Sequence, residues 1–159
     1  MDYKTIKGWI SEAGQMLSAR NTALQISALP CRTGNGSLEV CVITSRGIGR
    51  WIIPKGWPEP DLSHIEVAAK EAWEEAGLTG DMHPHLYATY TASKEIEPGI
   101  GIPVRMDVYL LLDPKQAKKF PERGQRSIEW LSIGEAAQRV DDSGLRNVLI
   151  RLESEGLPA

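Results

Sequence analysis

Three glutamates fall within five residues of this chain, at Glu71, Glu74 and Glu75. On an α-helix, which turns by roughly 100° per residue, all three lie on one face. Like charges at these spacings repel one another, and near the C-terminal end of a helix the dipole favours cations instead. Because carboxylate oxygens suit Mg²⁺, Mn²⁺ and Ca²⁺, the spacing indicates a divalent-metal site. The alternative is a solvated acidic face on an unrelated α/β protein.

The residues around the glutamates predict the helix that positions them. Ser63 and Glu66 have the spacing of a capping box, so the helix is expected to begin at Ile65 or just before it. Gly77 is placed to end it. The residues suited to packing closely on a sheet are Ala68, Ala69, Ala72, Trp73 and Ala76. Before the helix, two prolines between Gly56 and Leu62 predict a loop.

Alternating apolar residues and β-branched runs predict a mixed sheet around this helix. Strands are expected over residues 22–29, 38–44, 51–53, 86–92, 104–112 and 127–131. Loops are expected at Pro30 with residues 33–37, around residues 94–99, and over the basic stretch 115–126. Ser132 and Glu135 predict a second capped helix, and residues 145–153 predict a last amphipathic one. This order of elements predicts an α/β or α+β sandwich.

Composition narrows the class of protein. A chain of 159 residues with 42% hydrophobic and 25% charged residues is typical of one globular domain. A net charge of −3 gives no sign of a nucleic-acid-binding surface. Cys31 and Cys41 are expected to be buried thiols, and neither they nor the histidines have the spacing of a zinc site. We see no apolar run long enough to span a membrane and no signal peptide, so a cytoplasmic location without membrane partners is expected.

The stretch from Gly56 to Leu78 resembles the Nudix box, G-x5-E-x7-R-E-U-x-E-E-x-G-U, in which U is a bulky aliphatic residue. Gly56 takes the first glycine, the three glutamates keep their places, and Gly77 and Leu78 form the closing pair. The chain departs from the pattern at Leu62, Lys70 and Ala72, which stand where the family has its first glutamate, its arginine and its first aliphatic residue. Candidates to replace the first glutamate are Glu59, Asp61 and Glu66.

The wider chain is similar to one branch of the Nudix superfamily. The segments RWIIPKGWPE, KEAWEEAGL and RSIEWLSIGEAAQRV resemble the diphosphoinositol-polyphosphate and diadenosine-polyphosphate hydrolases. The resemblance implies an α/β/α sandwich around a mixed sheet, with the Nudix hydrolase domain over residues 22–159. Residues 1–21 precede it as an expected helix or arm, with partly helical spacing over residues 4–18. The chain is expected to act as a monomer or homodimer.

The resemblance also implies an activity and a set of site residues. Family members hydrolyse a diphosphate bond by water attack on phosphorus, using Mg²⁺ or Mn²⁺, and the substrates expected are nucleoside diphosphate derivatives, dinucleoside polyphosphates or diphosphoinositol polyphosphates. Glu74 and Glu75 are implied to be the principal metal ligands, and Glu71 a third ligand or the catalytic base. The carbonyl group of Gly56 is implied to be a further ligand, and Lys70 takes the place of the catalytic arginine.

Further candidates come from charge and ring chemistry. Arg50, Lys55 and Arg105 are predicted to bind the phosphorylated substrate, although an internal carboxylate would also explain Arg105 within its apolar strand. Solvated turns are the alternative for the other two. A basic cluster could hold a highly phosphorylated ligand: Lys118, Lys119, Arg123 and Arg126. Trp57 and Tyr90 are candidates to stack a base, Trp73 and Trp130 are expected in the core, and a later acidic ligand could be Glu95, Glu97 or Glu129.

The departures at Leu62 and Lys70 leave a second function open. A Nudix domain with an incomplete box could bind a phosphorylated ligand without turning it over, as a sensor or scaffold. Tight binding without hydrolysis at any metal concentration would favour that reading over a diphosphatase.

Overall fold

The structure, a computed structural model, describes residues 23–159, apart from the side chains of residues 95 and 96. The helix or arm expected over residues 4–18, and the boundary expected at residue 22, lie outside the described residues. None of the described helices is long and apolar enough to cross a membrane.

An eight-stranded mixed sheet forms the centre of the described chain. The strands are β1 (Ala23–Gly34), β2 (Ser37–Thr44), β3 (Trp51–Ile52), β4 (Lys55–Gly56), β5 (Leu78–Met82), β6 (Ala88–Glu97), β7 (Ile100–Gln116) and β8 (Ile128–Ser132). The main path runs β3-β2-β1-β7-β5, with β4 on β1, β6 on β7 and β8 on β2. Only β1 and β7 pair in parallel, and the other pairs are antiparallel.

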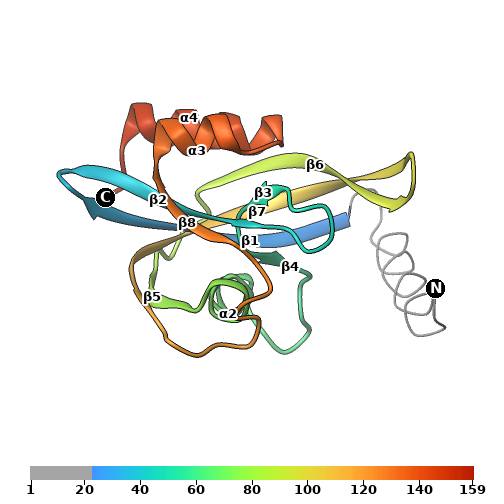
Figure 1. Ribbon diagram of the computed structural model, residues 1–159, viewed down its shortest axis with the longest axis horizontal. Helices are drawn as coiled ribbons and strands as arrows, with labels where there is room; N and C mark the ends of the chain where they lie inside the picture. The colour runs from blue at the N-terminus through green and yellow to red at the C-terminus, as the bar shows by residue number, and fades with distance from the viewer. Residues whose placement is uncertain (1–22) are drawn as a thin grey trace.

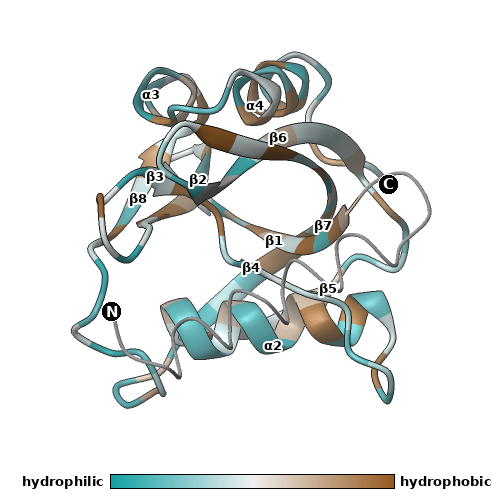
Figure 2. Cartoon of the chain, turned by 90° about the vertical axis from the view of Figure 1, so that its right-hand side faces the viewer, coloured by the Kyte–Doolittle hydropathy of each residue, from teal (hydrophilic) through white to brown (hydrophobic). Residues whose placement is uncertain are grey.

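Helices cover both faces of this sheet. Helix α2 (His64–Ala76) lies on one face, and α3 (Ile133–Arg139) and α4 (Ser143–Glu155) lie side by side on the other, as Figure 1 shows. The perpendicular view in Figure 2 shows the same three layers. The expected α/β/α sandwich around a mixed sheet is therefore confirmed.

Two apolar clusters hold the layers together. Leu29, Val108 and Leu149 belong to the cluster between the sheet and the pair α3–α4. On the other face, the small side chains Ala68 and Ala72 let α2 pack directly on the sheet. A smaller third cluster, made of Ala23, Val104 and Met106, lies near the end of β7 that follows the β6–β7 turn.

The predicted ends of α2 are confirmed in detail. Ser63 Oγ accepts from the Glu66 amide at 3.2 Å, and a Glu66 carboxylate oxygen accepts from the Ser63 amide at 3.1 Å. Gly77 ends the helix with a φ of 69°, in the left-handed region that favours glycine, and its amide donates to the helix carbonyls. The capped helix fixes which face the three glutamates share.

The strands differ from expectation at several places, and β4, the last residues of β1 and the last residues of β7 lie where no strand was predicted. Pro30 lies inside β1 rather than in a loop, because β1 changes its antiparallel partner there from β4 to β2. The missing N–H of proline is tolerated at such an interruption of the ladder. Residues 94–97 continue β6 into a hairpin with β7, and β5 directly follows Gly77 without having been predicted. These features depend on pairing with distant strands, which local periodicity does not report.

Candidate active site

The three glutamates of α2 line an open cleft of about 470 Å³. Its walls come from α2, from the β4 strand, and from the connection between β7 and β8. The cleft is lined by Gln25, Ser45, Arg46, Ile52, Lys55, Gly56, Trp57, Glu71, Glu74, Glu75, Lys94, Glu122 and Arg126. The structure thus brings the predicted Gly56 and all three glutamates together with one of the predicted phosphate-binding residues, Lys55.

Glu75 is the most buried of the three carboxylates, with 4% of its side chain exposed. One oxygen accepts from the backbone amide of Lys55 at 2.9 Å, and the other lies 2.6 Å from Nη2 of Arg126. Burial raises the pKa of Glu75, while the Lys55 amide and the Arg126 charge act in the opposite direction. Both oxygens are therefore held in fixed positions by groups from other elements.

Arg126 ties Glu75 to two further parts of the chain. Its Nη1 donates to the Thr44 carbonyl at 3.1 Å, and its Nη2 lies 3.1 Å from a Glu122 oxygen. The Glu122 amide donates to the Glu74 carbonyl, so the β7–β8 connection is fastened to the end of α2. Arg126 was predicted as one of a basic cluster for substrate, but the structure makes it a buried internal cation, 7% exposed.

Glu71 packs between Gly56 and Glu75. A Cβ atom added at Gly56 would collide with the Glu71 carboxylate, so only glycine leaves room for that group beside the β4 backbone. Burial, followed by the charge and hydrogen bond of Glu75 and the charge of Glu74, raises the pKa of Glu71 to about 8. Without a bound cation, Glu71 is therefore the member of the pair that holds the proton at neutral pH.

Glu74 lies at the outer side of the same face. Its nearest cation is Lys70, whose Nζ is 3.8 Å from one Glu74 oxygen. Lys70 was predicted to be catalytic, but it does not line the cleft; its closest partner is Glu59, at 2.7 Å. Glu59 thus supplies the carboxylate that pairs with this cation.

The departure at Leu62 now has a structural account. Leu62 is partly buried and packs its apolar side chain against the cluster beneath α2, where a carboxylate would lose solvent. Of the three replacements considered, Glu66 is occupied in the capping box and Asp61 is exposed. Only Glu59 contacts the cation that stands at the family's arginine position.

Two lysines line the cleft together with the glutamates. Lys55 Nζ donates to Gln25 Oε1 at 3.1 Å, and its pKa is lowered, chiefly by burial and next by the charge of Lys94. Lys94 reaches the same cleft from β6, and its Nζ lies 4.7 Å from the centre of the Trp57 ring. Lysines near carboxylates that bind a metal ion can hold an anionic group beside that ion.

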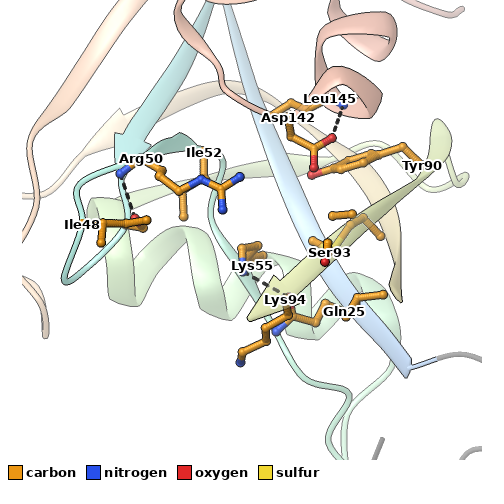
Figure 3. Close-up of a pocket in the computed structure, with 14 residues that line it drawn as sticks. Gln25, Ile48, Arg50, Ile52, Lys55, Tyr90, Ser93, Lys94, Asp142 and Leu145 are labelled. Atoms are coloured by element: carbon orange, nitrogen blue, oxygen red, sulfur yellow. Dashed lines mark hydrogen bonds between the residues drawn. The ribbon is translucent and has the colours of Figure 1, made fainter. Parts of the chain in front are cut away.

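A second cavity, of about 190 Å³, continues from the cleft along β6 and β7. Both spaces are lined by Gln25, Ser45, Ile52, Lys55 and Lys94. Beyond this shared wall, Figure 3 shows Arg50 on one side of the cavity and Tyr90 beside Asp142 on another. Arg50, predicted to bind substrate, therefore lies next to the second cavity rather than next to the glutamates.

Several predicted site residues lie elsewhere. Arg105 is on the opposite face of β7 from the cavity-lining Val104 and Met106, and its Nε bonds to Asp107 at 2.9 Å. This corrects its prediction as a substrate ligand, because successive residues of a strand point to opposite faces. Glu129 pairs with Arg139 at the surface, and Glu97 is exposed near the β6–β7 turn. The side chain of Glu95 is outside the described part.

The basic loop differs from its prediction, and so does one of the two tryptophans expected in the core. Lys118, Lys119 and Arg123 are exposed and line neither space. Trp130 packs against the core as expected, whereas the half-buried Trp73 is in none of the core clusters.

Sequence reasoning missed several polar residues that line these spaces, among them Gln25, Lys94, Glu122 and Asp142. Gln25 carried a usable signal, since a buried polar residue within a strand needs a partner, which here is Lys55. Asp142 carried another, because an aspartate before an amphipathic helix predicts an N-cap. Neither signal indicates proximity to α2, which depends on the pairing of the strands.

The donor set fits a hard divalent cation. It offers three carboxylates, and a cradle at Gly56 in which an added Cβ atom would meet Glu71. After burial, the charges of Glu75 and Glu74 raise the pKa of Glu71, and a bound cation would offset those charges. In the described residues, no three acidic, histidine or cysteine side chains already surround one point, so the glutamates are neighbours rather than a closed cage.

The segment from Gly56 to Leu78 forms a loop–helix–loop that places three glutamates beside a mixed sheet. This arrangement defines a Nudix-type phosphohydrolase architecture. Comparison with known proteins agrees. The family model for the NUDIX domain matches residues 23–152. The chain is 31% identical over 150 residues to the chloroplastic Nudix hydrolase 21 of Arabidopsis thaliana, covering 88% of this chain and 72% of that protein.

Solved structures show the same fold. A binary complex of the C. elegans Ap4A hydrolase superposes with a TM-score of 0.64 at 19% identity, covering 84% of this chain and 96% of that one. The NUDIX domain of Shewanella oneidensis NrtR, complexed with ADP ribose, gives 0.62 at 15% identity, covering 85% and 90%. The chain belongs to the Nudix hydrolase family, and its enzyme class is that of a Nudix diphosphatase.

Proposed function

We propose that this protein hydrolyses the diphosphate bond of a nucleoside diphosphate derivative, with Mg²⁺ or Mn²⁺ bound by the α2 glutamates. The observation that carries the proposal is the cleft that Glu71, Glu74, Glu75 and Gly56 line together with Lys55 and Lys94. Carboxylates and cations that line one cleft suit a metal ion and a substrate that is itself polyanionic. The basic cluster no longer favours a highly phosphorylated ring as the substrate, because Lys118, Lys119 and Arg123 are exposed and do not line the cleft.

The chain's own residues divide the work. When bound, the divalent ion neutralises phosphate oxygens and lowers the pKa of water. Glu74 and Glu75 would be its principal ligands, with Glu71 and the Gly56 carbonyl adjacent. Lys55 and Lys94, which line the same cleft, would hold the non-bridging oxygens of the diphosphate. Arg126 holds Glu75 in place and is a positioning residue.

Proton transfer falls to Glu71. Water forms a new bond to one phosphorus while the bridging P–O bond breaks, and the second phosphate leaves with the bonding electrons. The proton lost by water needs an acceptor, and Glu71, once the negative charge around it is neutralised, is a carboxylate at the centre of the cleft. This role assigns Glu71 as the base.

The test is turnover of a substrate panel by wild type, Glu74→Gln and Glu129→Gln, each with Mg²⁺ or Mn²⁺. Glu129→Gln is the matched control, because it removes the same charge from an exposed carboxylate outside the cleft. We expect Glu74→Gln to lower kcat/KM by at least about 100-fold, as for loss of a metal contact, and Glu129→Gln to match wild type. Equal background activity in all three proteins would reject the proposal.

A non-catalytic ligand-binding domain is the second candidate. The Lys55 amide and Arg126 each bind one oxygen of Glu75. Among the described residues, no group of side chains forms a closed metal cage. Both observations favour the binding domain. Calorimetry with ADP-ribose separates the two functions. Binding that is tight but without hydrolysis in either metal would select the binding domain.

A further inference from the structure

The second cavity has the size of a single ring. Its volume of about 190 Å³ is a little larger than a cavity of roughly 150 Å³ that accepts benzene. Val104 and Met106 from β7 line it together with Ile52 and Leu145. These apolar walls would bury the faces of one flat or puckered ring. The cavity and the cleft share lining residues, among them Lys55 and Lys94, so a ring seated in the cavity would lie near a diphosphate in the cleft.

Asp142 gives the cavity a hydrogen-bond acceptor away from the glutamates. It lines the second cavity but not the cleft. Its Oδ1 accepts from the amides of Gly144 at 2.8 Å and Leu145 at 3.2 Å, which caps α4. Within the described chain, the other carboxylate oxygen has no hydrogen bond, and Asp142 has no ion-pair partner. Half of this carboxylate is therefore available to a ligand.

The neighbour of Asp142 in the cavity wall is a neutral group. Tyr90, which Figure 3 shows beside it, keeps its phenol protonated because burial, and next the charge of Asp142, raise its pKa. Three cations also line the cavity: Arg50 from the exposed β2–β3 connection, and Lys55 and Lys94 from the wall shared with the cleft. Among the described residues that line the cavity, Asp142 is the one carboxylate.

From the apolar walls and the free oxygen of Asp142 we infer that the second cavity binds the organic group of the substrate as a single ring whose N–H or O–H donates to Asp142. A nucleobase amine and a sugar hydroxyl share this chemistry. A phosphorylated ring would bring anionic oxygens against the Asp142 carboxylate, which like-charge repulsion disfavours. The inference rests on the proposed function, and it makes Asp142 a specificity-determining residue rather than a structural cap alone.

The cap itself supplies the matched variants. In Asp142→Asn the amide oxygen still caps α4, because asparagine and aspartate are equivalent N-caps, but the group left for the cavity changes from an acceptor to a donor. Asp142→Ser keeps a capping oxygen and leaves nothing for the ligand. Asp141→Asn removes the same charge one residue earlier, from an exposed side chain that does not line the cavity.

The experiment measures kcat and KM of wild type and these three variants on ADP-ribose, a diadenosine polyphosphate, UDP-glucose and a diphosphoinositol polyphosphate. We expect Asp142→Asn and Asp142→Ser to lower kcat/KM by about 10- to 100-fold on the three nucleotides, mainly through KM, as for loss of a hydrogen bond to a charged group. Asp141→Asn should match wild type. Thermal melts should show folded protein throughout.

A change of base identifies the donor. If replacing the adenine of ADP-ribose by unsubstituted purine, which lacks the exocyclic amine and has no other N–H, removes the difference between wild type and Asp142→Asn, the donor is the base amine. If the difference persists, the donor is a sugar hydroxyl. Equal kcat/KM of Asp142→Asn and Asp141→Asn on every nucleotide would overturn the inference, as would a diphosphoinositol polyphosphate being the best wild-type substrate.

Failure of the proposed function gives a separate result. If wild type hydrolyses nothing, the same variants are compared by calorimetric binding of ADP-ribose. Weaker binding by Asp142→Asn than by Asp141→Asn would uphold the cavity assignment while rejecting the diphosphatase. Equal binding by both, or none by wild type, would reject the cavity assignment too.

Discussion

Arg126 Nη2 lies 2.6 Å from Glu75 Oε2, and both side chains are more than nine-tenths buried. A buried ion pair of this kind holds the end of α2 against the β7–β8 connection. Removal of one partner leaves an uncompensated charge inside the protein, which is far more destabilising than replacing both. The pair therefore couples the stability of the fold to the position of a candidate metal ligand.

We predict that Arg126→Met lowers the free energy of unfolding by about 3–5 kcal/mol, since it leaves Glu75 buried without its cation. Adding Glu75→Leu to this variant should restore most of the loss, while activity stays absent because a metal ligand is gone. Urea denaturation of both single variants and the double variant measures the coupling. Additive losses in the double variant would show that the two side chains act independently.

The proton on Glu71 predicts how stability depends on pH without metal. Its pKa is raised from an ordinary 4.5 to about 8, so between these values the folded state binds a proton that the unfolded state releases. Stability is therefore expected to fall as pH rises from about 4.5 to 8. Urea melts in EDTA across this range should show the fall in wild type and a flatter profile in Glu71→Gln. Parallel profiles would contradict the assignment.

Gly56→Ala should damage the site while sparing the fold. The new Cβ would collide with the Glu71 carboxylate, but Gly56 does not have a positive φ, so the backbone accepts alanine. We expect the stabilisation of wild type by Mn²⁺ in thermal melts to be lost or reduced. Gly34→Ala is the matched control, because its Cβ would meet the Glu39 carboxylate in the β1–β2 hairpin. Equal Mn²⁺ shifts in both variants would contradict this role for Gly56.

Glu59→Gln tests whether Glu59 compensates for Leu62. The Glu59–Lys70 pair is partly exposed, so its removal should leave stability near that of wild type. Lys70 would then be free to pair with Glu74 instead, and we expect a higher Mn²⁺ concentration for half-maximal activity. Asp61→Asn, at an exposed neighbouring position, serves as the control. If both variants need the same Mn²⁺ concentration for half-maximal activity, Glu59 does not compensate for Leu62.

Much of the fold could be predicted because its signals are local. The ends of α2 follow from Ser63, Glu66 and Gly77, whose capping bonds join residues a few positions apart. Most strands were located by alternation, but not Pro30 within β1 or β5 after Gly77, since both depend on partners distant in sequence. Arg105 was placed wrongly because its strand was identified without knowing which face meets the cavity, although Asp107 two residues on shares its face.

That Glu71, Glu74 and Glu75 share one face of a capped helix follows from their spacing in the chain, since helical geometry repeats every few residues. The differences between these carboxylates come from the folded structure. Glu75 is buried against Arg126, Glu71 lies against Gly56 and holds a proton, and Glu74 stays half-exposed. Those differences arise from the pairing of β1, β4 and β7 and the course of the β7–β8 connection. Sheet pairing joins residues far apart in the chain, and no local pattern encodes which of them will meet.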